Sequence, residues 1–158
     1  MKTQRNQLEK IVLEIQNNPG IRFRELARIC HMPNSTMAYY TNKLERLGTV
    51  KVKKKANECR FFSSHINSNE KPVIIALRKR SQRKILFLLR KSHLFSDICK
   101  ATGHSPSTIS EKLDMLESLG IIEERLLHRR RKMFKIKDLE KTMEIIKKYQ
   151  HMIKITEP

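Results

Sequence analysis

The sequence predicts a mainly α-helical chain with small β-hairpins, built as two tandem copies of one unit and completed by a C-terminal helix. The first observation is an internal repeat, because "NSTMAYYTNKLERLGTV" returns 72 positions later as "PSTISEKLDMLESLGII". At that fixed offset, with no gap, the matching pairs are Phe23 and Phe95, Ser35 and Ser107, Thr36 and Thr108, Leu44 and Leu116, Glu45 and Glu117, Leu47 and Leu119, Gly48 and Gly120, and Phe62 and Phe134. The second observation is that both halves show the same order of helical and alternating apolar patterns, so each copy is a small domain of roughly 70 residues.

Three helices and a hairpin are predicted in the first copy. Apolar residues at helical spacing predict a first helix that ends at "NNPG" and a short second helix that ends at "HMPNS", where Asn34 and Ser35 are candidate caps. A third helix follows and stops at Gly48. Its inward-facing residues are expected to be Met37, Thr41, Leu44 and Leu47. The stretch "TVKVKKKANECRFFS" then alternates around the turn "KANE", which predicts a β-hairpin.

The second copy repeats this order, with helices in "KILFLL" and "FSDIC" and a hairpin in "IIEERLLHRRRKMFKI". Its third helix has the inward-facing residues Ile109, Leu113, Leu116 and Leu119. Between the copies, "SSHINSNEKPVIIALRKR" indicates a brief linker followed by a docking helix. The predicted divisions are a first domain at 1–66, the linker and docking helix at 67–80, a second domain at 81–137 and the C-terminal helix at 138–158.

The charge of the chain is strongly positive in both halves. There are 34 Lys and Arg against 16 Asp and Glu, which leaves a formal net charge of +18. Residues 1–68 contribute +8 and residues 69–158 contribute +10, so neither half is merely a basic tail. This distribution predicts a polyanionic partner for both units.

The order helix, helix, turn, helix, hairpin is that of the winged helix-turn-helix domain. The stretch "PSTISEKLDMLESLGIIEE" resembles the recognition helix and first wing strand of MarR-like and ArsR-like transcription regulators. The preceding "IALRKRSQRKILFLLRKS" is similar to the opening helices of ArsR-like domains. The resemblance covers both copies and extends to the tandem winged-helix regulators of archaea. It implies a sequence-specific regulator of transcription that binds double-stranded DNA, with recognition helices in the major groove and basic wings on phosphate or the minor groove.

The two third helices present different outward faces. The first has the DNA-binding candidates Asn34, Ser35, Thr36, Tyr39, Asn42, Lys43 and Arg46, together with Ala38. The second has the candidates Ser107, Thr108, Ser110, Glu111 and Lys112, next to the acids Asp114 and Glu117. Because acids repel phosphate, the first helix is expected to read bases, and the second to bind DNA less closely or to serve contacts within a dimer. Glu111 can also accept a hydrogen bond from a cytosine amino group, which keeps base reading by the second helix open. Of the adjacent tyrosines, Tyr39 is expected to face outward and Tyr40 inward.

Both hairpin tips are basic. The wing candidates for DNA binding are Lys53, Lys54 and Lys55, with Lys51 nearby, and Arg129, Arg130, Arg131 and Lys132, with His128 nearby. Consecutive cations at one turn repel each other unless an anion binds, which favours contacts with phosphate. The alternative is solvated charge that protects the hairpin edges from pairing with other strands.

An apolar stripe along the predicted C-terminal helix suggests a homodimer. Its residues are Leu139, Met143, Ile146, Tyr149 and Ile153. A stripe with no remaining domain to cover is a candidate dimer seam. A dimer would suit an inverted-repeat site, and a monomer could also span two neighbouring major-groove faces with its two units.

Neither a metal, a cofactor nor an enzymatic activity is expected. The three cysteines are odd in number, and "FSDICKATGHS" lacks the metal-binding cysteine pair that ArsR-like sensors carry at the matching place. No Gly-rich phosphate loop or carboxylate pair is evident, and a nuclease built from Asp97, Glu111 and Asp114 is the remaining enzymatic alternative. No signal peptide is evident and the apolar runs are too short for a membrane span, so a cytoplasmic, nucleoid-associated protein is expected.

Two rival functions remain besides the regulator. Tandem winged helices also occur in protein-interaction adaptors, although adaptors have little use for basic wings. An unspecific architectural DNA-binding protein would use the same wings without reading sequence. RNA binding is a further alternative, which is disfavoured because aromatic residues are only 6% of the chain and Trp is absent.

Overall fold

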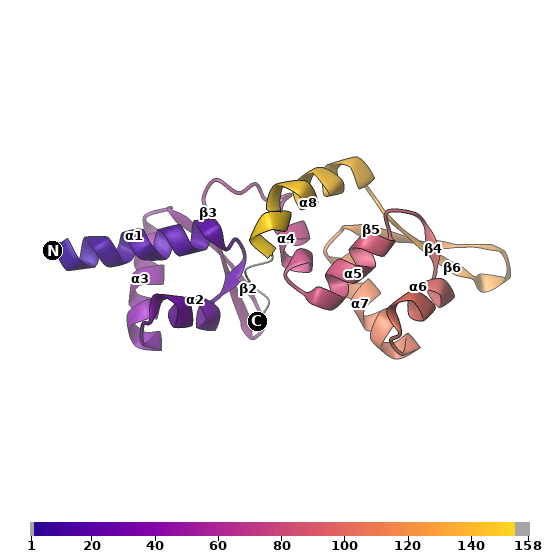
Figure 1. The fold of residues 1–158 in the computed structure, drawn as a ribbon, viewed down its shortest axis with the longest axis horizontal. Helices are drawn as coiled ribbons and strands as arrows, with labels where there is room; N and C mark the ends of the chain where they lie inside the picture. Colours follow the sequence, from indigo (N-terminus) through magenta and orange to yellow (C-terminus); the bar gives the residue numbers. More distant parts are fainter. Residues whose placement is uncertain (1, 154–158) are drawn as a thin grey trace. The chain divides into compact units, whose positions relative to one another are not determined.

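The computed structural model describes residues 2–153, which form two compact units. The first contains residues 2–71 together with 152–153, and the second runs from Pro72 to His151. Both units have the order helix, short strand, helix, helix and hairpin (Figure 1). The predicted fold class is therefore confirmed: mainly α-helical, with small β-hairpins in two tandem copies.

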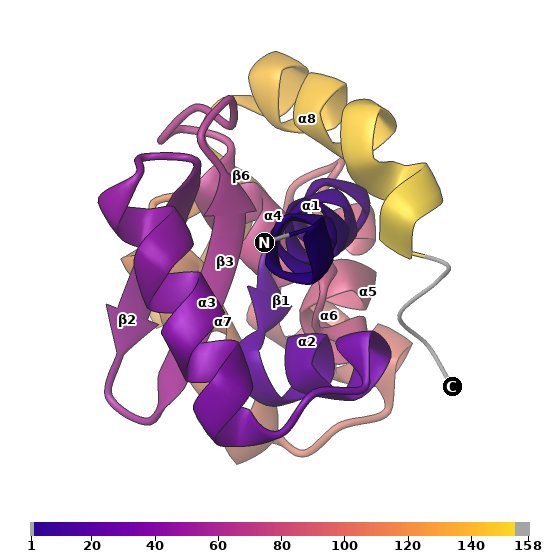
Figure 2. The same ribbon diagram turned by 90° about the vertical axis from the view of Figure 1, so that its left-hand side faces the viewer.

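The first unit places three helices around a three-stranded antiparallel sheet. Its elements are α1 (Lys2–Asn17), β1 (Ile21–Arg22), α2 (Phe23–Cys30), α3 (Asn34–Arg46), β2 (Val50–Lys55) and β3 (Glu58–Ser63). The strand order is β1-β3-β2, as Figure 2 shows for the unit that contains the N-terminus. The short strand β1 was not predicted, because two residues are too few to show an alternating pattern.

One face of this sheet holds the core of the first unit. The buried residues of this core are Ile11, Ile15, Ile21, Leu26, Ala27, Cys30, Met37, Tyr40, Leu44, Val50 and Phe61. They come from all three helices and from alternate positions of the strands. Because side chains alternate along a strand, Lys51, Lys53 and Lys55 of β2 lie on the opposite, outer face of the sheet.

The second unit repeats this arrangement with different lengths. Its elements are α4 (Lys71–Leu77), α5 (Arg80–Leu88), β4 (His93–Leu94), α6 (Phe95–Thr102), α7 (Pro106–Ser118), β5 (Ile122–Leu126), a 3₁₀ turn (His128–Arg130), β6 (Lys132–Ile136) and α8 (Leu139–Ile153). The first residue of α4 and the last two residues of α8 belong to the first unit. A helix, α4, is present in the segment 67–80, and residues 78–79 separate it from α5. The strand order β4-β6-β5 is the same as in the first unit.

The hairpins of the two units differ in register by one residue. Phe61 pairs with Ile21 of β1, whereas Phe134 pairs with His93 of β4, which is the residue 72 positions after Ile21. Phe134 is therefore the counterpart of Phe61, and the sequence match of Phe62 with Phe134 is wrong in structural terms.

Ring contacts and turn lengths support this assignment. The Phe95 and Phe134 centroids are 6.4 Å apart, and the Phe23 and Phe61 centroids are 6.3 Å apart. In the first hairpin the pair Lys55 and Glu58 encloses residues 56–57, whereas in the second the pair Leu126 and Lys132 encloses residues 127–131. The longer second turn shifts the returning strand, which a gapless comparison of the sequence cannot show.

Two details of the third helices also differ from the prediction. Leu47 was expected to face the core but is 66% exposed, although it caps α3 and its N–H donates to the Lys43 carbonyl at 3.0 Å. Leu119, its counterpart after α7, is half-buried. Gly48 and Gly120 then stop the two helices with φ of +69° and +74°, a left-handed conformation that favours glycine.

The apolar stripe of α8 is mostly covered within the chain. Ile146 is 1% exposed and Tyr149 6% exposed, Met143 is half-buried, and Leu139 is exposed. The side chain of Ile153 lies outside the described residues. An open seam running through Ile146 and Tyr149 was therefore not a correct expectation, because contacts inside the single chain already bury both side chains.

Candidate nucleic-acid interface

Helix α3 has a buried face and an exposed polar face, as predicted. Met37, Tyr40, Thr41 and Leu44 are buried and fix the helix to the core. Of the DNA-binding candidates, Asn34, Ser35, Tyr39, Asn42 and Arg46 are exposed, and Thr36, Lys43 and the neighbouring Ala38 are half-buried. The exposed face therefore offers hydroxyl, amide and cationic groups to a partner such as the base edges of a major groove.

The adjacent tyrosines divide between the two faces as expected. Tyr39 is 57% exposed and Tyr40 is 7% exposed. Their ring centroids are 5.3 Å apart with an interplanar angle of 70°, which is an edge-to-face arrangement. The buried Tyr40 ring thus supports the exposed Tyr39 ring on the surface of α3.

The N-termini of the two candidate recognition helices differ in their caps. Pro33 precedes α3 and makes no side-chain cap, so the expectation that Asn34 or Ser35 caps this helix is wrong, since both lie in its first turn. Ser105 precedes α7, and its Oγ accepts a hydrogen bond from the Thr108 backbone N–H at 3.3 Å. The first-turn amides of α3 thus have no side-chain acceptor in the described residues, which suits contact with a phosphate.

The Ser105 cap also involves two of the DNA-binding candidates in the second unit. Ser105 Oγ lies 2.9 Å from Thr108 Oγ1 and 3.1 Å from Ser107 Oγ. Ser105 was not among the predicted residues, although Ser before Pro at the start of a helix is a recognisable cap signal. Because these hydroxyls already bond to one another, Ser107 and Thr108 have less capacity to bind DNA.

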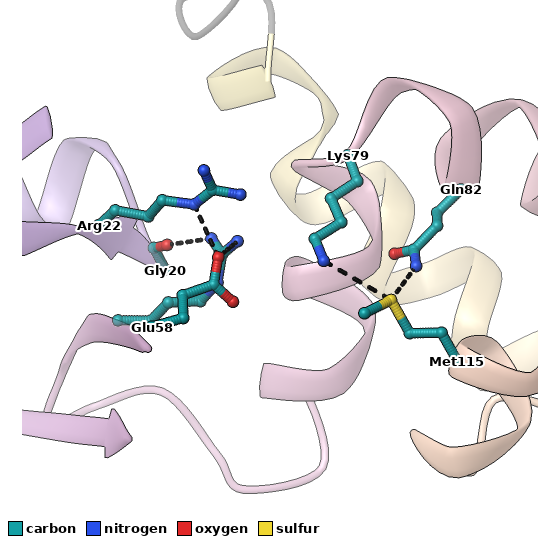
Figure 3. Close-up of polar contacts among 7 residues, drawn as sticks. Gly20, Arg22, Glu58, Lys79, Gln82 and Met115 are labelled. Carbon is teal, nitrogen blue, oxygen red and sulfur yellow. Dashed lines mark hydrogen bonds and ion pairs between the residues drawn. The ribbon is translucent and has the colours of Figure 1, made fainter. Parts of the chain in front are cut away.

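The rest of the α7 surface is acidic. Ser110 and Glu111 are exposed and Lys112 is half-buried, while Asp114 and Glu117 are exposed beside them. Met115, four residues after Glu111, is half-buried, and its sulfur accepts hydrogen bonds from Gln82 Nε2 and, at 3.6 Å, from Lys79 Nζ (Figure 3). These contacts fix α7 to α5 and the residue before it, and leave the acidic face turned outward.

The lysines of the first wing are open to solvent. Lys54 and Lys55 are exposed and Lys53 is half-buried. Within the described part of the chain, none of these three lysines forms an ion pair. Their positive charge is therefore available to an external anion.

A network of ion pairs, which was not predicted, connects strand β3 of this wing to β1. Glu58 Oε1 lies 2.7 Å from Arg22 Nε and 2.7 Å from Arg60 Nη2 (Figure 3). Arg60, only 3% exposed, also donates from Nη1 to the Gly20 carbonyl at 2.8 Å. The network depends on the pairing of β1 with β3, so no signal for it exists in a sequence in which β1 was not recognised.

The second wing pairs charges along its strands. Lys132 Nζ lies 3.0 Å from Glu124 Oε2, and Lys135 Nζ lies 2.9 Å from Glu123 Oε1. The Lys135 hydrogen bond is the main cause that lowers the pKa of Glu123 from its ordinary value. Among the wing candidates, Lys132 is therefore partly neutralised by its own hairpin.

The tip of the second wing consists of exposed cations on a constrained turn. His128, Arg129, Arg130 and Arg131 are all exposed. Arg129 and Arg130 have φ of 60° and 56°, and the Leu127 N–H donates to the Arg131 carbonyl at 2.7 Å across the turn. Two consecutive left-handed non-glycine residues carry backbone strain, so the turn has a defined and uncommon shape that directs the arginines outward.

Other chemistry has little support in the described residues. No group of three or more His, Cys, Asp or Glu side chains within residues 2–153 is placed to hold a metal ion. Burial is the main cause that raises the pKa of the Cys30 and Cys59 thiols, which makes their reactive thiolate forms less populated. None of the helices described is both long enough and apolar enough to cross a membrane.

By element order and sheet topology, both units are winged helix-turn-helix domains, and the chain is a tandem protein of this class. Residues 5–51 match the family of winged helix-turn-helix DNA-binding domains, and residues 80–124 match the arsR family of bacterial regulatory proteins. A curated relative, an uncharacterized HTH-type transcriptional regulator of Methanocaldococcus jannaschii, is 28% identical over 110 residues. That match covers 69% of this chain but only 28% of the relative, so the chain spans little more than a quarter of its length. The predicted resemblance to winged-helix regulators is confirmed.

Proposed function

We propose that the protein is a sequence-specific regulator of transcription that binds double-stranded DNA. The observation that carries this proposal is the exposed face of α3, where Tyr39, Asn42 and Arg46 project from a helix fixed by its buried face. A helix of this kind fits the major groove, where each base pair presents a distinct pattern of donors and acceptors. The two family matches and the regulator from M. jannaschii support the same function.

The wings supply contacts that do not depend on sequence. Lys53, Lys54 and Lys55 of the first wing and Arg129, Arg130 and Arg131 of the second are assigned to backbone phosphate or the minor groove. Lys132 is a weaker candidate, because it already pairs with Glu124.

The two recognition helices are assigned different roles. In this proposal α3 reads bases through Asn34, Ser35, Thr36, Tyr39, Asn42, Lys43 and Arg46. Helix α7 binds DNA less closely, because Glu111, Asp114 and Glu117 are exposed on it and the hydroxyls of Ser107 and Thr108 are engaged by Ser105. The contribution of α7 to base reading is then limited to contacts from Ser110, Glu111 and Lys112.

The finer assignments follow from this function. The protein acts without catalysis, in keeping with the regulator families that it matches, and DNA binding associates it with the nucleoid. If it forms a homodimer through α8, Leu139 and Met143 are the stripe residues that are not fully buried within one chain. Two units in one chain could also contact two neighbouring groove faces without a dimer.

Selection from a randomised duplex DNA pool, followed by sizing of the complex in solution, tests the proposal. Enrichment of one compact motif is expected, and its loss in Asn42→Ala with an unchanged fold would connect it to α3. Recovery of DNA without any common motif would favour an unspecific architectural protein, and failure to retain DNA at low salt would favour a protein-interaction adaptor. The mass of the complex gives the number of chains on the motif.

A further inference from the structure

The outer face of the first sheet carries a cluster of lysines that is separate from the α3 surface. Val50 of β2 is buried in the core, so Lys51 and Lys53 point to the other face of the strand. Lys51 is the cross-strand partner of Phe62, which lies on the same outer face. Lys71 Nζ lies 5.5 Å from the centroid of the Phe62 ring. Lys71 therefore joins Lys51 and Lys53 on this face.

The three lysines form a positive cluster on a sheet with a single acidic residue, Glu58, which strand alternation places on the same outer face. None of them takes part in an ion pair with the residues that the structure describes. Glu58 already bonds to Arg22 and Arg60. Burial, followed by the charges of Lys51 and Lys53, lowers the pKa of Lys71. Like charges held together and partly removed from water are destabilising unless an anion binds between them.

We propose that Lys51, Lys53 and Lys71 form a phosphate-binding site on the outer face of the first wing. Ammonium groups donate charge-assisted hydrogen bonds to phosphate oxygens, and three such groups match the charge and the several acceptors of one phosphate. The Phe62 ring holds Lys71 in place by a cation–π contact and leaves its N–H groups free to donate. Lys71 lies outside the wing tip, so the site adds a contact beyond the tip lysines.

The phosphate can come from a DNA backbone or from a free phosphorylated molecule. The DNA source rests on the function proposed above and would extend the footprint around the side of the wing that faces away from α3. A free phosphorylated ligand would instead bind the same residues without DNA and could bias how the wing meets DNA. Both sources present phosphate oxygens that accept hydrogen bonds from the lysine ammonium groups. The resonance of the Lys71 ammonium should therefore change when either one binds.

The test follows the Nζ resonances of lysine in the full-length chain, labelled with ¹⁵N and held at low ionic strength. Inorganic pyrophosphate is titrated first, with sodium chloride of equal ionic strength as the control for screening. We expect a saturating shift at Lys71 and a rise of its pKa toward 10.5, the ordinary value. Lys51→Gln should weaken pyrophosphate binding about tenfold, as expected for one charge-assisted hydrogen bond. The matched control Lys147→Gln, an exposed lysine of α8, should leave binding unchanged.

A second titration uses duplex DNA. A Lys71 shift with both probes, and a salt slope about one lower in Lys71→Gln, identify the DNA backbone as the source. A shift with pyrophosphate alone identifies a free phosphorylated ligand. A Lys71 resonance that moves no more than in sodium chloride with either probe overturns the site. The Lys71 resonance can be followed with any duplex, so this test does not need a preferred DNA motif. A failed motif selection would contradict the proposed regulator function, whereas the phosphate site would still be tested by the titrations.

Discussion

His31 and Gly103 occupy the same place in the two units and share a left-handed backbone. His31 directly follows α2 and Gly103 directly follows α6, and their φ angles are 55° and 69°. The two residues are 72 positions apart in the sequence. The repeat therefore conserves the backbone conformation of this turn while one copy uses glycine and the other a residue with a Cβ, for which this conformation is strained.

Gly103→Ala should destabilise the second unit by about 1 kcal/mol, the usual cost of placing a Cβ in the left-handed region. No atom lies within 4 Å of a Cβ built at this position, so the cost comes from the backbone and not from a clash. Urea unfolding monitored by circular dichroism measures the effect. His31→Gly is the matched control and should not destabilise the first unit. An unchanged midpoint for Gly103→Ala would show that the turn relaxes to another conformation.

The helical faces were predictable because their spacing follows directly from the geometry of a helix. The periodicity of α3 separated buried Met37 and Leu44 from exposed Tyr39, and the same period placed Ile109 and Leu113 in the second core. Leu47 has the spacing of an inward-facing residue but is 66% exposed, because helical spacing does not show how far the core extends along the helix. The burial of Ile146 within one chain could not be predicted either. An apolar stripe indicates that a helix face is covered, but it does not indicate whether the same chain or a second copy covers it.

Features that depend on pairing between distant strands could not be predicted. The strands β1 and β4 have two residues each, too few for an alternating signal. Without β1, nothing in the sequence brings Arg22 to Glu58. The contact of Lys71 with the Phe62 ring likewise joins two different elements, α4 and β3, and has no signal in the local pattern. The second wing has a turn of five residues instead of two and strands that are each one residue shorter, which gives a net insertion of one residue. Only the register of the sheet reveals that Phe134 corresponds to Phe61.

The ion pair of Glu123 with Lys135 should make the second wing sensitive to acid. The pKa of Glu123 is lowered in the folded chain, chiefly by the Lys135 hydrogen bond, so the stabilisation is fully present above about pH 4.5. It diminishes as the pH falls through the lowered pKa. Titration of the Glu123 carboxyl by NMR checks this, and Lys135→Gln should move the titration back up toward 4.5. The same midpoint in wild type and Lys135→Gln would contradict the role of the pair, with Lys147→Gln as the neutral control.

Neutralising the second wing tip should weaken DNA binding without changing which sequences are preferred. Replacing Arg129, Arg130 and Arg131 together by Gln removes three exposed cations, so the slope of log K against log salt should fall by about one for each phosphate that is no longer neutralised. Fluorescence anisotropy at several salt concentrations measures this slope. Lys132→Gln is the comparison and should change it less, because Lys132 already pairs with Glu124. A triple variant with the wild-type slope would place the tip away from DNA.

Tyr39 should affect recognition of DNA far more than it affects folding. Tyr39→Ala removes an exposed ring, so the fold should lose no more than the aromatic pair with Tyr40 contributes, about 1 kcal/mol. Tyr40→Ala empties a buried position and should cost about 3–5 kcal/mol of unfolding free energy. If α3 lies in the major groove, Tyr39→Ala should narrow the difference between the selected motif and a scrambled duplex by about 1–3 kcal/mol. Equal decreases of affinity for both duplexes would show that Tyr39 contacts the sugar-phosphate backbone and that other residues of α3 read the bases.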